Sequence, residues 1–244
     1  MKSPAMNRTV VESPAVETPE RRGARRRSEA AADYVAMFTV TMYTVLLAFI
    51  VVILWQRLDD INSDVRSESQ DLTQIIWSAQ RLPAADRTAM RSAVTDYAGA
   101  VLGHEWPPAN LAATDASAMA VASLRSHLAT AFSLDEQTTL RDQELAVVDD
   151  LTAARADRIG KTFSSSYPGI LTVALVLLSA ATVLTPFLLG LRAEPLSIIG
   201  IAVTVGVVVA ALVLVIDMQG DYGGAFSVSR IPLQTVQQQL VLTS

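Results

Sequence analysis

The feature that most constrains this chain is a run of 19 residues, from Met37 to Trp55, without a charged side chain. At about 1.5 Å per residue, a helix of this length spans roughly 28 Å, which matches the hydrocarbon core of a bilayer. The run is longer than the apolar core of a signal peptide, and no small-residue cleavage site follows it. We therefore predict a retained transmembrane helix over residues 34–56.

Two further apolar segments, residues 168–191 and 196–216, are also long enough to cross a membrane. The four residues 192–195 separate them, so we expect a tight helical hairpin. The whole chain is 51% hydrophobic and 18% charged, whereas soluble domains carry charge on about a quarter of their residues. These values favour a membrane protein with three transmembrane helices, in direct contact with the lipid bilayer.

Basic residues predict how the chain is oriented. Seven of the first 33 residues are Lys or Arg, and a cluster precedes the first span: Arg21, Arg22, Arg25, Arg26 and Arg27. Such residues mark the cytoplasmic side of a membrane. Prolines and interspersed charges indicate a disordered basic arm over residues 1–33. On this topology, residues 57–167 and the tail 217–244 lie outside the cytoplasm, across the inner membrane of a bacterium.

The segment between the first two spans shows helical periodicity and no strand-like alternation. Its first helix continues the transmembrane run to about residue 80, with an apolar stripe that must pack within the chain or on another subunit: Leu58, Ile61, Val65, Leu72, Ile75 and Ile76. Further helices are predicted over residues 84–103, 117–132 and 134–162. The last one starts at the capping pattern of Ser133 and Glu136. The expected fold is an all-α membrane protein whose first and second spans are joined by an extramembrane antiparallel helical bundle.

The remaining tail, residues 217–244, contains three glycines that permit a sharp reversal after the third span. Its apolar residues at helical spacing predict a short amphipathic helix that lies on the bundle or on the membrane surface: Leu233, Val236 and Leu240.

Composition excludes several kinds of chemistry. The chain has no cysteine and two histidines, His104 and His127, so thiol chemistry and histidine-rich metal sites are absent. No Ser-His-Asp set, phosphate-binding loop or metal signature is present, and we expect neither an enzyme nor a cofactor. The formal net charge of −5 argues against a nucleic-acid partner.

Glu105 and Trp106 form the most distinctive polar and aromatic pair outside the spans. One interpretation makes Glu105 a ligand or ion contact near the membrane surface. The other, which we favour, has Glu105 hydrogen-bonded to a neighbouring helix and Trp106 anchoring the bundle or the headgroup layer. His104 points elsewhere on a helix, so we expect no metal site here.

Inside the spans no side chain is ionised, which argues against ion-coupled transport. A pore remains possible because hydroxyl groups can line one. The candidates lie in the first and second spans: Thr39, Thr41, Tyr43, Thr44, Thr172, Ser179, Thr182 and Thr185. Packing between helices is the favoured interpretation of these residues. Pro186 is expected to kink the second span.

Asp217, where the third span ends, is expected to cap a turn or form an ion pair, with a pore mouth as the alternative.

The order of several short motifs resembles one family. Residues 43–49 and Trp55 are followed by a helix with Glu68, then Leu82-Pro83, Tyr97-Ala98 and residues 105–107. Later the chain has Arg155 and Arg158 before the second span, Asp217 after the third, and then Tyr222-Gly223-Gly224 and Val228-Ser229. Over about residues 35–240 the sequence is similar to bacterial membrane proteins with a bestrophin-like domain. The resemblance implies a membrane protein and an oligomeric channel for small anions.

Two functions are therefore expected. The first is a non-enzymatic membrane component that forms a homo-oligomer or docks on other membrane proteins. The alternative is an oligomeric anion channel of the bestrophin-like kind. In bestrophins the helical middle region is cytosolic, whereas the basic arm of this chain predicts that its middle segment lies outside.

Overall fold

A computed structural model describes residues 19–106, 111–131, 138–164, 169–188 and 195–242. The described residues are helical, apart from short turns and one connecting loop, and contain no strand. The elements, in chain order, are α1 (Pro19–Ala79), α2 (Ala84–His104), the 3-10 turn η1 (Leu111–Thr114), α3 (Asp115–Ala131), α4 (Thr138–Phe163), α5 (Gly169–Leu188), α6 (Pro195–Met218) and α7 (Ile231–Leu242). The prediction of an all-α fold is confirmed.

Helix α1 runs through 61 residues without a break, at a length of about 90 Å. Its end at Ala79 agrees with the predicted end near residue 80. Its start does not agree with the expected disorder of residues 1–33, because the helix already begins at Pro19. Glu, Arg and Ala are strong helix formers, and extending an existing helix carries no nucleation cost. The first 18 residues of the expected arm lie outside the described part of the chain.

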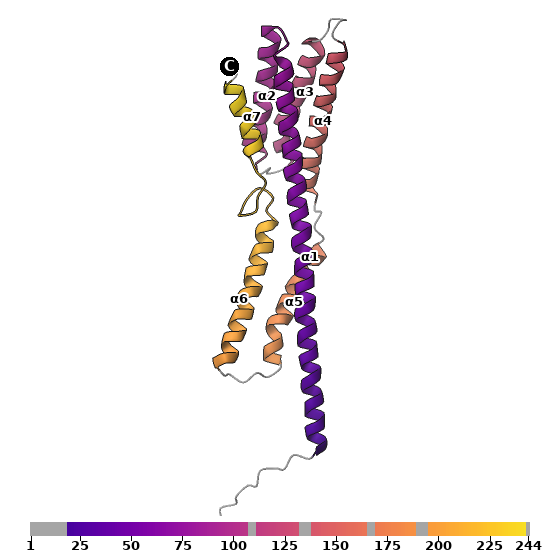
Figure 1. The fold of residues 1–244 in the computed structure, drawn as a ribbon, viewed down its shortest axis with the longest axis vertical. Coiled ribbons are helices and arrows are strands. Elements are labelled where there is room, and N and C mark those ends of the chain that lie inside the picture. Colours follow the sequence, from indigo (N-terminus) through magenta and orange to yellow (C-terminus); the bar gives the residue numbers. More distant parts are fainter. Residues whose placement is uncertain (1–18, 107–110, 132–137, 165–168, 189–194, 243–244) are drawn as a thin grey trace, which may run out of the picture.

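Within the described ranges, three helices are long and apolar enough to cross a membrane, as the sequence predicts. They are the part of α1 that contains the uncharged run, α5, and α6, and the three pack against one another at one end of the molecule (Figure 1). Helices α5 and α6 lie within a few residues of the predicted spans. Helix α5 continues through Pro186 to Leu188, and the predicted kink at this proline stays a prediction.

The other end of the molecule is a helical bundle (Figure 1). Helices α2, α4 and α7 pack on the far part of α1, and α3 packs on α2 and α4. Observed boundaries agree with the predicted ones to within a few residues, while Ser133 and Glu136 lie outside the described residues. Helix α7 packs on α1 and α2 with Leu233, Val236 and Leu240 buried, so the C-terminal helix belongs to the bundle and not to the membrane surface. The bundle therefore contains more than the segment between the first two spans.

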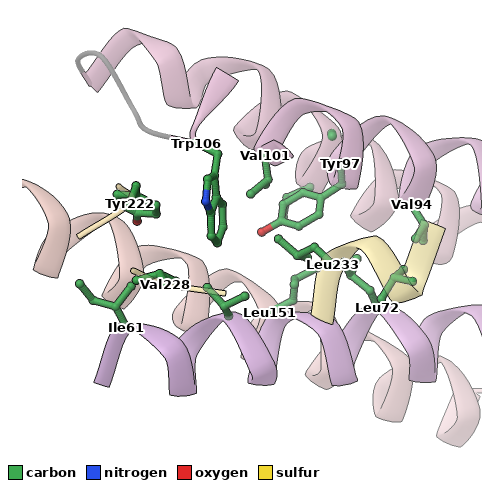
Figure 2. Close-up of a cluster of buried hydrophobic side chains, with 14 of the residues drawn as sticks. Ile61, Leu72, Val94, Tyr97, Val101, Trp106, Leu151, Tyr222, Val228 and Leu233 are labelled. Atoms are coloured by element: carbon green, nitrogen blue, oxygen red, sulfur yellow. The ribbon is translucent and has the colours of Figure 1, made fainter. Parts of the chain in front are cut away.

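The apolar stripe of α1 is covered inside the chain. All six of its predicted members are buried: Leu58, Ile61, Val65, Leu72, Ile75 and Ile76. Helices α2, α4 and α7 pack around it, and Figure 2 shows Ile61 and Leu72 in the same cluster as Val94, Leu151 and Leu233. Of the two packing partners left open by the sequence, the structure selects the intramolecular one.

Candidate functional site

A charged residue interrupts the apolar stripe of α1 at a position that faces the core. Glu68 lies three residues after Val65 and four before Leu72, so the helical period turns it inward with them. Its side chain is completely buried, at 0% exposure. A buried carboxylate needs partners within hydrogen-bonding distance, because burying a bare charge is costly.

Arg158 on α4 supplies the main partner. Its Nε donates to Glu68 Oε1 at 2.5 Å, and its Nη2 donates to Glu105 Oε2 at 2.6 Å. Glu105 follows the last residue of α2 and is also fully buried. One guanidinium group thus joins three helices through two carboxylates, and we call Glu68, Arg158 and Glu105 the buried ion network.

A second set of polar groups occupies the remaining oxygens of the network. The Tyr97 hydroxyl donates to Glu68 Oε2 at 2.8 Å, and the Ser117 hydroxyl donates to Glu105 Oε1. Arg155, one turn before Arg158, donates to Ser117 Oγ at 2.8 Å and to the Thr114 carbonyl at 2.6 Å. Every carboxylate oxygen of the network therefore accepts a hydrogen bond from this chain.

The electrostatics of the network follow from its burial. Removal from water raises the pKa of Glu68, and the nearby Arg158 guanidinium opposes this effect. Burial and the adjacent Glu68 carboxylate also raise the pKa of Tyr97, which stays a neutral hydrogen-bond donor. Such an arrangement is stable only while all its members are present, since loss of one leaves an uncompensated buried charge. The network thus connects α1, α2 and α4 through charged hydrogen bonds.

Trp106 extends the site toward the connection between α6 and α7. Its ring meets that of Tyr222 edge-on with 5.0 Å between centroids. Both residues belong to the buried cluster drawn in Figure 2. The Arg230 guanidinium lies 5.8 Å from the Trp106 ring centroid. The Tyr222 hydroxyl is 2.7 Å from Thr162 Oγ1 on α4. Trp106 is buried, so it anchors the bundle and not the headgroup layer.

Ionic contacts also fasten the base of the bundle near the end of the uncharged run. Arg57 on α1 donates from Nη2 to Asp221 Oδ2 at 2.9 Å and from Nη1 to the Ser164 carbonyl at 3.2 Å. Lys161 Nζ donates to Asp64 Oδ2 at 2.7 Å. These contacts connect α1 to the end of α4 and to the loop after α6.

Asp217 performs the capping role expected of it. Its Oδ2 accepts the backbone N–H groups of Ala225 at 3.0 Å and Phe226 at 3.3 Å. The chain reverses at Gly224, whose φ of 91° is a left-handed conformation that glycine adopts readily. Asp217 therefore shapes the connection between α6 and α7.

The hydroxyl residues proposed to line a pore lie on α1 and α5, which pack against each other. The hydroxyls of Thr39, Thr44 and Thr182 each donate to the carbonyl four residues earlier, at 2.8–2.9 Å. Such bonds satisfy a hydroxyl within its own helix. Tyr43 differs, because it is 5% exposed and its hydroxyl has no hydrogen-bond partner among the described residues. Pro186 is half-buried in α5.

His104 does not join the acidic residues of the site. His104 is exposed while the adjacent Glu105 is buried, so the two side chains diverge as the helical geometry predicts. Within the described ranges, no group of three His, Asp or Glu side chains is placed to hold a metal ion.

Sequence reasoning selected Glu105 and Trp106 but assigned no role to Glu68 and Arg158 beyond their place in the family resemblance. A usable signal was present in both helices. Glu68 continues the apolar stripe of α1, and Arg155 and Arg158 continue that of Val148 and Leu151 on α4. A charge at a core position on two helices indicates that the charges pair with each other.

Three membrane-length helices in the described part of the chain, joined to an ion-paired helical bundle, define the class of this molecule as a helical membrane protein. A model of the Bestrophin-like domain matches residues 8–233, and the chain therefore belongs to this family. The family resemblance found in the sequence is confirmed. Neither a curated protein nor a solved structure matches the chain.

Proposed function

We propose that this protein is a non-enzymatic membrane component that assembles with further copies of itself through α6. One observation carries the proposal. Ala202, Gly206 and Ala210 follow one another at four-residue spacing on α6, and all three are exposed. A methyl group added to Gly206 would meet no atom within 4 Å, so no neighbouring element among the described residues requires a small residue there.

Small residues at this spacing have a specific use in membranes. Lipid tails are as apolar as leucine, so helices associate there through close packing, and Gly and Ala allow two backbones to approach. A glycine inside a helix costs about 1 kcal/mol relative to alanine. The cost of Gly206 on the outward face of α6 is offset when a second helix packs closely against that face.

The bundle offers less support for assembly. The α1 stripe that the sequence left available for a neighbouring subunit is buried by α2, α4 and α7 of the same chain. We therefore expect the contact between copies to lie at α6 within the membrane.

Cysteine crosslinking tests this proposal without interference, because the natural chain has no cysteine. Gly206→Cys should form a disulfide-linked dimer when the protein is oxidised in native membranes. Val207→Cys is the matched control, since Val207 is 60% exposed and points about 100° away around the helix. Equal crosslinking of the two variants, or none in either, would contradict assembly through the Gly206 face.

A channel for small anions is the second candidate, and one observation favours it. The hydroxyls of Tyr43 on α1 and Ser179 on α5 are buried within the membrane-length helices and have no hydrogen-bond partner among the described residues. Polar groups at this depth are normally satisfied, and a hydrated path would satisfy them. Planar-bilayer recording with chloride tests the idea: a conductance that Tyr43→Phe alters supports it, and the absence of current above background removes it.

The proposed orientation has the N-terminus in the cytoplasm and the bundle outside the inner membrane of a bacterium. The basic residues before the first span support it. A membrane-impermeant maleimide should label Met119→Cys, at an exposed position of α3, in intact cells and should leave Glu20→Cys unlabelled. The reverse pattern would show the opposite orientation.

A further inference from the structure

A small hollow lies where the membrane helices meet the bundle. It has a volume of about 150 Å³ and is lined by residues of α1 and of the connection between α6 and α7: Trp55, Leu58, Asp59, Asn62, Phe226 and Ser227. This connection crosses the molecule between its two ends (Figure 1). The hollow is separate from the buried ion network and from the outward face of α6.

The connection is held firmly in the conformation that brings Phe226 to the hollow. The Phe226 backbone N–H donates to Asp217 Oδ2 at 3.3 Å, and the Ser229 N–H donates to Asn62 Oδ1 at 2.9 Å. The Val228 N–H donates to the Asp221 carbonyl at 2.9 Å. Phe226 nevertheless remains 39% exposed, so this loop presents an aromatic ring at the surface.

The hollow lies beside the end of the uncharged run, where we expect the headgroup layer. Trp55 is the last residue of the uncharged run of α1, and it is 59% exposed. Tryptophan at such a position lies at the boundary between hydrocarbon and headgroups. Asp59 is one helical turn further on, at the level where phospholipid headgroups begin.

The chemistry of the hollow fits a positively charged group. Aromatic rings attract cations through their faces, and Trp55 and Phe226 provide two rings. Asp59 adds a carboxylate that is exposed and makes no ion pair within the described ranges of this chain. The Asn62 side chain already makes two hydrogen bonds within the chain. Its Oδ1 accepts the Ser229 backbone N–H, and its Nδ2 donates to the Leu58 carbonyl at 2.9 Å.

We propose that the hollow between Trp55, Asp59 and Phe226 binds the ammonium group of a phospholipid headgroup, such as phosphatidylethanolamine. The ammonium contacts the Asp59 carboxylate and the two aromatic rings. Headgroups that end in neutral glycerol carry no cation for this site, so the protein distinguishes the two lipid classes.

The test measures lipid binding to the full-length protein in detergent by native mass spectrometry. Phosphatidylethanolamine and phosphatidylglycerol with identical acyl chains are titrated separately. We expect one phosphatidylethanolamine per chain to bind about fivefold more tightly than phosphatidylglycerol. Asp59→Asn should remove most of this preference. Asp60→Asn is the matched control, because Asp60 is the exposed neighbour and does not line the hollow.

Phe226→Leu provides a second variant that keeps apolar volume and removes the aromatic ring. It should lower the preference about two- to fivefold. Equal binding of the two lipids to the natural protein would overturn the proposal. An equal loss in Asp59→Asn and Asp60→Asn would also overturn it, since net charge and not the hollow would then determine binding.

Discussion

Replacing Arg158 by methionine removes the centre of the buried ion network. Glu68 and Glu105 are both completely buried, and this guanidinium pairs with both of them at 2.5 and 2.6 Å. Breaking a buried ion pair by removing one partner typically costs about 3–5 kcal/mol, because a bare charge stays in the core. For a chain of this size, the thermal midpoint should fall by about 6–20 °C. The assay is thermal unfolding of the full-length protein in lipid nanodiscs.

A surface pair provides the control. Arg125 pairs with Asp149, and both side chains are more than half exposed, so Arg125→Met should cost less than about 1 kcal/mol. Adding Glu68→Gln and Glu105→Gln to Arg158→Met should recover about half of the loss, since the remaining buried groups are then neutral. If Arg158→Met is no more damaging than Arg125→Met, the network does not hold the bundle together.

The effect of Arg158→Met should also depend on pH. Burial already raises the pKa of Glu68 above its ordinary value of 4.5, and loss of the guanidinium raises this pKa further. A folded-state pKa above the unfolded one means that stability is lost as pH rises through the folded value. The deficit of the variant should therefore be larger at pH 8 than at pH 5. A deficit that grows on acidification would refute this electrostatic explanation.

Two further substitutions test other features of the fold. Gly224→Ala should cost about 1–3 kcal/mol, because the residue has a left-handed φ and the new Cβ would lie 2.7 Å from Cγ of Asp217. Gly223→Ala, where an added Cβ meets nothing, is the control in the same thermal assay, and equal midpoints would contradict the strain. Asp71→Asn should stabilise the protein by less than about 1 kcal/mol at pH 8, since burial and the nearby Asp150 raise the Asp71 pKa to about 6 and this group is partly exposed. This gain should shrink as pH falls through 6, because the natural carboxyl then takes up a proton in the folded state, and a gain that persists at pH 5 would exclude this cause.

Local sequence signals predicted the helices well. The uncharged run and the apolar stripe were sufficient to place the end of α1 within one residue of Ala79. Helix α7 was predicted from the spacing of its apolar residues, but its docking surface was not. On that surface the Ser69 hydroxyl donates to the Pro232 carbonyl at 2.9 Å. The two residues are 163 positions apart in the sequence, so no local pattern relates them. Periodicity shows which face of a helix is buried and does not identify its neighbour.

The buried ion network shows the same limit more clearly. Arg158 is 90 positions from Glu68 and 53 from Glu105, so no local pattern relates them. Charged residues such as these are common on exposed helix faces. Only their positions in the helical repeat, in line with the apolar stripe, indicate that they face the core. For Asp217 the sequence left capping and ion pairing open, and the hydrogen bonds to the loop after α6 show the capping role.

Because α1 is one continuous helix, a tilt of its membrane-length part also moves its far end, which lies in the bundle. Trp77 near its far end is 31 residues from Leu46 in the middle of the uncharged run, which is about 46 Å along the axis. A tilt of about 10° around that midpoint would carry the far end sideways by about 8 Å. Changes in bilayer thickness or in the packing of α6 would therefore be amplified into displacement of the bundle.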